Sequence, residues 1–138
     1  MSFLAPYLPT SAGWLGHWQL IVAAAAVFNF VQNFMTLKLT RRIYNNVPPT
    51  SITALQARTF AVWTLTSALI RGYAAYNINN KIVYDMAFMT YLIAFGHFSS
   101  ELLIFRTCKL NAGVLSPVIV STSSLFWMFV QYDFYVKN

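Results

Sequence analysis

The chain has 138 residues, of which 58% are hydrophobic and 17% aromatic, and nine Lys and Arg against three Asp and Glu give a formal charge of +6. Only 9% of the residues are charged, whereas soluble domains carry about 25%. This composition excludes an ordinary soluble domain, because so much apolar surface would aggregate unless lipid covered it. We therefore expect one membrane domain, residues 1–138, with no separate soluble domain.

Four apolar runs predict four membrane-spanning helices, at about residues 14–37, 54–75, 84–105 and 114–132. The first run follows no Lys or Arg and is too long for a cleaved signal peptide. The expected fold is an all-α integral membrane protein, a four-transmembrane-helix bundle.

The first run carries a stripe of polar residues, Asn29, Gln32, Asn33 and Thr36, at spacings of three and four. Amides in lipid normally form hydrogen bonds with a neighbouring helix. We therefore expect this face to turn toward another helix of this chain or of a partner.

The connections between the runs have clear turn and cap signals. Pro48 and Pro49 cannot continue a helix, so residues 38–53 are predicted to form the main loop. Thr53 and Gln56 have the spacing of a capping box at the start of the second helix. Residues 77–81 predict a tight turn, and Pro117 is expected in the first turn of the fourth helix, where its missing N–H costs nothing.

The flanking charges predict the orientation of the chain in the membrane. Six basic residues lie in or beside the connections after the first and third runs, and three lie on the opposite side. The six are Lys38, Arg41, Arg42, Arg58, Arg106 and Lys109, and the three are Arg71, Lys81 and Lys137. The positive-inside rule then places loops 38–53 and 106–113 in the cytosol. The net charge is thus interpreted as a topology signal, and no nucleic-acid partner is expected.

Ionisable residues inside apolar runs are costly and need partners. Antiparallel connectivity puts Arg58 and Glu101 at a similar depth, and it puts Arg71 near Asp85 on the opposite side. We therefore predict the ion pairs Arg58–Glu101 and Arg71–Asp85, with Asp133 as a third possible member of the second group.

His97 and Glu101 lie four residues apart, on one helical face. A zinc site needs three or four protein ligands, and the few His, Glu and Cys residues lie at different depths, so we expect no metal site. Two interpretations of His97 stay open: a buried structural histidine, or a general acid–base pair with Glu101. Cys108 is the single cysteine and cannot form an intrachain disulfide.

Four short segments together resemble the ergosterol biosynthetic protein 28 family. They are LQARTF at residues 55–60, INNK at 78–81, GHFSSE at 96–101 and GVLSP at 113–117. The resemblance extends over almost the whole chain. The loop at residues 45–49 and the aromatic C-terminus resemble fungal rather than animal members.

This resemblance implies a non-enzymatic protein of the endoplasmic reticulum membrane that acts in ergosterol biosynthesis. Its implied partners are a sterol C4-methyl oxidase, an NAD-dependent sterol-4-carboxylate 3-dehydrogenase (decarboxylating), a 3-keto-steroid reductase and other late sterol enzymes. A homo-oligomer stays open. The family implies no catalytic residue and no cofactor.

Eight residues are therefore only candidates for structural or partner-binding roles: Arg58, Glu101, His97, Arg71, Asp85, Asn29, Gln32 and Asn33. The alternative function is a small sterol-binding membrane enzyme, or a lipid or proton carrier, that uses His97 and Glu101.

Overall fold

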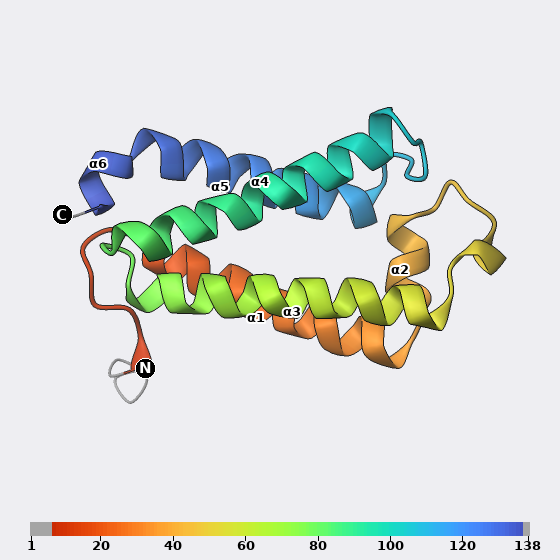
Figure 1. The fold of residues 1–138 in the computed structure, drawn as a ribbon, viewed down its shortest axis with the longest axis horizontal. Helices are drawn as coiled ribbons and strands as arrows, with labels where there is room; N and C mark the ends of the chain where they lie inside the picture. The colour runs from red at the N-terminus through yellow and green to blue at the C-terminus, as the bar shows by residue number, and fades with distance from the viewer. Residues whose placement is uncertain (1–6, 137–138) are drawn as a thin grey trace.

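The computed structural model describes residues 7–136, which form an all-helical bundle with no strand among them (Figure 1). Four long helices run along the molecule: α1 (Leu15–Met35), α3 (Ala54–Tyr76), α4 (Lys81–Leu103) and α5 (Ala112–Val130). The short helices α2 (Lys38–Ile43) and α6 (Tyr132–Tyr135) lie at opposite ends, and Pro49–Ser51 forms a 3-10 turn. The all-α prediction is confirmed.

Three helices in the described part of the chain, α1, α4 and α5, are long and apolar enough to cross a membrane. The sequence predicted four spans. The second predicted span forms α3, which has the length of a membrane helix but is less apolar, because Gln56, Arg58, Arg71 and several hydroxyl side chains interrupt its apolar surface.

Side-chain caps set the helix starts. Thr53 Oγ1 accepts a hydrogen bond of 3.1 Å from the Gln56 amide, as the capping-box spacing predicts. Asn80 caps α4, which therefore begins at Lys81. Asn111 accepts from the Val114 amide at 3.1 Å, so α5 begins at Ala112.

Two local predictions were wrong. Pro117 lies inside α5 and not in its first turn, because the Asn111 cap starts the helix earlier than expected. The predicted loop 38–53 begins with the unpredicted helix α2, whose Thr40 and Ile43 side chains face inward and are buried. Packing of these two residues stabilises a helix that is too short to form on its own.

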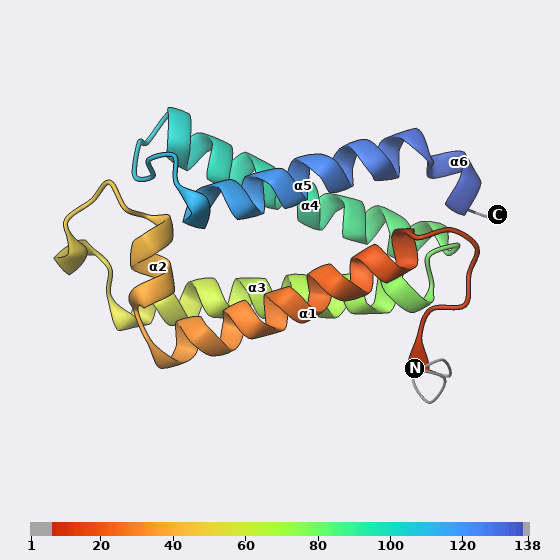
Figure 2. The same cartoon turned by 180° about the vertical axis from the view of Figure 1, so that it is seen from behind.

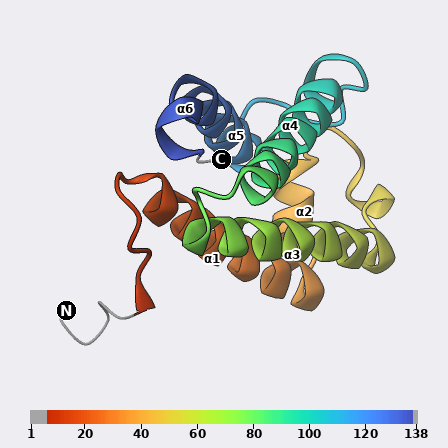
Figure 3. The ribbon, with the colours of Figure 1, turned by 60° about the vertical axis from the view of Figure 1, so that its left-hand side comes forward.

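The long helices form two layers. α1 packs along α3, and α4 packs along α5, while α3 and α4 lie close where the turn at residues 77–80 joins them (Figures 1 and 2). The view from the side shows α4 and α5 above α1 and α3 (Figure 3). We call the two ends of the bundle the α2 end and the α6 end.

The buried side chains form two separate core clusters. The cluster toward the α6 end centres on Tyr84, Tyr91 and Met128. The cluster toward the α2 end centres on Phe60 and Phe98. Each layer of the bundle contributes to both clusters, so the layers are held together at two places along their length.

A glycine allows the close contact between α1 and α3. A Cβ atom on Gly16 would lie 2.9 Å from the carbonyl oxygen of Ala75. Small residues at helix interfaces let the backbones approach closely, which is how helices pack in lipid.

Candidate functional site

Five buried residues form a polar node that joins all four long helices. The Tyr91 hydroxyl donates a hydrogen bond of 2.7 Å to Gln19 Oε1, and Gln19 Nε2 lies 3.3 Å from the Met128 sulfur. Arg71 Nε donates to Thr90 Oγ1 at 3.0 Å. The Arg71 guanidinium carbon lies 4.1 Å from the centre of the Tyr91 ring, which is a cation–π contact. The node therefore fixes the rotation of each helix relative to the others.

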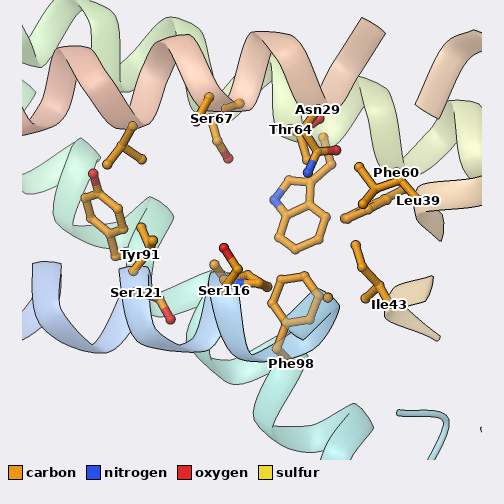
Figure 4. A pocket seen from close by; sticks show the side chains of 18 of the residues that line it. Asn29, Leu39, Ile43, Phe60, Thr64, Ser67, Tyr91, Phe98, Ser116 and Ser121 are labelled. Carbon is orange, nitrogen blue, oxygen red and sulfur yellow. The ribbon is translucent and has the colours of Figure 1, made fainter. Parts of the chain in front are cut away.

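A cavity of about 430 Å³ lies between the two layers; we call it the central cavity (Figure 4). Arg71 and Tyr91 of the polar node line it, and so do Ile43, Phe60 and Phe98 of the cluster toward the α2 end. Its volume falls within the range of about 300–1,000 Å³ that is typical of ligand pockets.

An aromatic cluster surrounds His97 toward the α2 end. The Trp63 ring is 5.1 Å from His97 in an edge arrangement and 5.9 Å from Phe98 in a stacked one. His97 Nε2 is hydrogen-bonded to the Tyr44 hydroxyl at 2.6 Å. Tyr44 lies just after α2, outside the apolar helices, and its burial raises the pKa of its phenol. The phenol thus stays neutral, and its O–H can donate to the imidazole.

Beside this cluster, hydrogen bonds join the loops on either side of it. Asn46 donates through its backbone N–H to Thr107 O at 3.0 Å and through its side chain to Arg106 O at 2.6 Å. The Lys109 amide donates to Asn45 Oδ1 at 2.6 Å. These bonds order the loop after α2 against the loop after α4.

Six exposed basic side chains lie at the α2 end, in α2, near the start of α3 and in the loop after α4. We call them the basic platform: Lys38, Arg41, Arg42, Arg58, Arg106 and Lys109. Glu101 is the single carboxylate among the described residues of this end, and its Oε2 accepts a hydrogen bond from the Thr107 hydroxyl. The platform therefore carries a strong positive charge on an ordered backbone.

The predicted ion pair between Arg58 and Glu101 is not formed. Arg58 is exposed because its neighbours Ala57 and Phe60 occupy the inner face of α3. Glu101 instead bonds to Thr107, which follows it closely in the chain.

The predicted pair between Arg71 and Asp85 is not formed either. Asp85 Oδ2 pairs with Lys81 Nζ at 2.6 Å, one turn earlier on α4, and this is the ion pair that residues 7–136 contain. Arg71 turns into the bundle toward Thr90 and Tyr91. Asp133, the suggested third member, lies exposed on α6.

The polar stripe of α1 is only partly turned inward. Asn33 is buried and accepts a hydrogen bond of 2.6 Å from the Thr40 hydroxyl of α2, while its amide nitrogen donates to Asn29. Gln32 is exposed. The stripe thus meets a helix of this chain through Asn33.

His97 and Glu101 form neither a hydrogen bond nor an ion pair with each other in the described part of the chain. Among the described residues, the side-chain bond of His97 goes to Tyr44 and that of Glu101 goes to Thr107. Residues 7–136 hold no group of three or more His, Cys, Asp and Glu side chains that could bind a metal ion.

The sequence analysis missed Gln19, Tyr91, Tyr44 and Thr107. Gln19 had a usable signal, since an amide inside an apolar run needs a hydrogen-bonding partner. Tyr91 had none, because an apolar helix can carry a tyrosine on either its lipid face or its buried face.

Comparison with known proteins identifies the family. The model of the family described as "Erg28 like protein" matches residues 15–126. The chain belongs to this family.

Relatives named Ergosterol biosynthetic protein 28 match most of the chain. The protein of Saccharomyces cerevisiae is 46% identical over 124 residues, which cover 89% of this chain and 83% of that protein. The protein of Candida albicans is 44% identical over 134 residues, covering 97% and 95%. The mouse protein, named a homolog, is 39% identical over 117 residues, covering 84% and 83%. No solved structure matches the chain. The resemblance stated from the sequence motifs is confirmed, and with it a place in ergosterol biosynthesis.

Proposed function

We propose that this chain is a non-catalytic membrane scaffold that holds the sterol C4-demethylation enzymes together at the endoplasmic reticulum. Its partners are the sterol C4-methyl oxidase, the sterol-4-carboxylate 3-dehydrogenase (decarboxylating) and the 3-keto-steroid reductase. The family membership supports a role in ergosterol biosynthesis. The relatives' names describe a biosynthetic protein and do not name a reaction.

The observation that carries the proposal is the basic platform. Six exposed cations lie in or beside loops that hydrogen bonds hold in place. A pre-ordered surface loses little conformational entropy when a partner binds, and charge complementarity speeds association and selects acidic partner surfaces. The platform is therefore suited to bind the acidic surfaces of membrane enzymes.

Tethering would benefit this pathway for a physical reason. A sterol intermediate dissolves in the membrane, and each enzyme must find it there. Holding sequential enzymes on one scaffold replaces the bulk concentration by an effective local one, which reaches the mM range for short linkages. The scaffold itself needs no chemistry for this effect.

The orientation follows from the same charges. We propose that the platform faces the cytosol, in agreement with the positive-inside rule. We also propose that α3 crosses the membrane as the fourth span, because it is 23 residues long and packs along α1. Its Arg71 is shielded within the bundle.

Co-purification tests the scaffold role. The tagged chain is expressed in Saccharomyces cerevisiae that lacks its own relative, and the three enzymes are measured in the purified complex. Replacing Lys38, Arg41 and Lys109 by Gln should remove most of the bound enzymes, and added salt should weaken the wild-type complex because it screens exposed charges. Lys81→Gln, at the opposite end, is the control and should retain them.

Two results would contradict the proposal. One is full retention of all three enzymes by the triple variant while it accumulates normally. The other is turnover of a C4-methyl sterol by the purified chain alone with loss of turnover in His97→Ala, which would indicate the enzyme alternative.

A further inference from the structure

The central cavity has the size and length of a lipid-binding site. It follows α3 from Phe60 to Arg71, a distance of about 16 Å at a rise of 1.5 Å per residue. Residues from both layers line it, with α1 and α3 on one side and α4 and α5 on the other (Figure 4). An elongated ligand would therefore lie along the helices, between the two layers.

The walls of the cavity are mostly apolar and their character changes along its length. Phe60, Trp63 and Phe98 line the part toward the α2 end, and Ala25 and Ala94 provide flat walls nearby. Such surfaces suit the body of a lipid, because they offer dispersion contacts, and Asn29, Thr64 and Ser116 add a few polar groups to this part of the cavity (Figure 4).

The part of the cavity near the polar node contains a buried positive charge. Arg71 is only 8% exposed. Its Nε bonds to Thr90, and no carboxylate in residues 7–136 lies within ion-pair distance of it. A guanidinium has five N–H donors, and within the described chain the other four have no hydrogen-bonding partner. A buried charge without a counter-ion is costly.

A carboxylate would satisfy this group. The guanidinium fork binds a carboxylate through two parallel hydrogen bonds, and such charge-assisted bonds are among the strongest in proteins. Ser67 lies one turn before Arg71 on the same face of α3; it is buried and also lines the cavity, so its hydroxyl adds a donor nearby. We propose that the central cavity binds a lipid carboxylate, with its carboxylate at Arg71 and its apolar body extending toward Phe60 and Phe98.

The other cation that lines the cavity does not serve the same role. Arg42 belongs to the basic platform and is exposed, so water already solvates its charge. Arg71 is the buried one, and it gains most from a bound anion. The matched control for Arg71 is Arg58, which lies exposed on the same helix and does not line the cavity.

Lipid binding in the central cavity does not require that the chain acts as a scaffold. A sterol that carries a carboxylate and a fatty acid share the proposed chemistry, and the test must separate them. The probes are radiolabelled 3β-hydroxy-5-cholenoic acid, its methyl ester and palmitic acid. Each is bound to the purified full-length chain in detergent micelles, and nonspecific partition is measured with empty micelles.

The wild-type chain should bind at least one of the two acids. If steroid acids are the ligand class, the steroid acid should bind about tenfold more tightly than its ester, because a hydrogen bond to a charged group is worth that much. Arg71→Met should weaken acid binding by about the same factor and leave ester binding unchanged. Arg58→Met should bind as the wild type does. The preferred acid then identifies the source of the carboxylate.

Three results would overturn the proposal. One is no retention of either acid above empty micelles, and another is equal binding of the steroid acid and its ester, with palmitic acid bound no more tightly than either. The third is an equal loss of acid binding in Arg71→Met and Arg58→Met. If Arg71→Met does not fold, Ala94→Leu provides a second variant, because it fills the cavity and keeps the charge. Binding of the preferred acid must then fall, and unchanged binding would place the acid outside the cavity.

Discussion

The Tyr44 hydroxyl and His97 Nε2 are 2.6 Å apart, although 53 residues separate them in the chain. This bond joins the end of α2 to the C-terminal part of α4 and lies within the aromatic cluster. It also gives the histidine of the GHFSSE segment a structural partner.

The first prediction concerns this bond. Tyr44→Phe should lower the free energy of unfolding by about 1 kcal/mol, because it removes one hydrogen bond and leaves the aromatic packing in place. Thermal unfolding of the purified protein in detergent measures the loss. Tyr73→Phe is the control, since Tyr73 is exposed on α3, and an equal effect of both changes would mean that the bond contributes nothing.

The second prediction concerns the polar node. Gln19→Leu should cost about 1–3 kcal/mol, because it leaves the buried Tyr91 hydroxyl without its acceptor. Adding Tyr91→Phe should recover part of this loss, since both partners are then apolar. The double-mutant cycle is measured by thermal unfolding. If the two losses simply add, Gln19 and Tyr91 are not coupled.

The third prediction compares two glycines. Gly16→Ala should destabilise the bundle, because its Cβ would lie 2.9 Å from the Ala75 carbonyl oxygen and would push α1 away from α3. Gly72→Ala meets nothing within 4 Å, so it should stabilise α3 by up to about 1 kcal/mol through helix propensity. Opposite shifts of the unfolding temperature are expected, and a shift of the same sign in both would contradict the contact between α1 and α3.

The fourth prediction concerns the reactivity of Cys108. This thiol is buried in the loop after α4, and the burial raises its pKa. Because the thiolate is the reactive form, a raised pKa means less thiolate at neutral pH and slow reaction with N-ethylmaleimide. The rate should rise only at a pH above the usual range for a cysteine. Unfolding the chain in denaturant should make labelling fast at neutral pH, and equal rates for the folded and unfolded chain would show that Cys108 is not protected.

The four long helices could be predicted because they depend on local features, although α4 and α5 begin a few residues before the predicted spans. The apolar runs set the four long helices, and the Thr53 cap and the turn before Lys81 act through backbone groups only a few residues away. The family could also be recognised, because its motifs are short and continuous in the chain. α2 could not be predicted, since Thr40 and Ile43 stabilise it only by packing against distant residues.

The partners of the charged residues were decided by the tertiary structure. The sequence gives the depth of each residue in the membrane but not the rotation of its helix, and an error in rotation moves a side chain from the inside to the outside. Arg58 therefore lies on the surface, and Asp85 pairs with Lys81 on its own helix. The chain by itself determined a helical membrane protein of a recognisable family. Only the packing of the two layers placed Arg71 beside Tyr91 and opened the central cavity next to it.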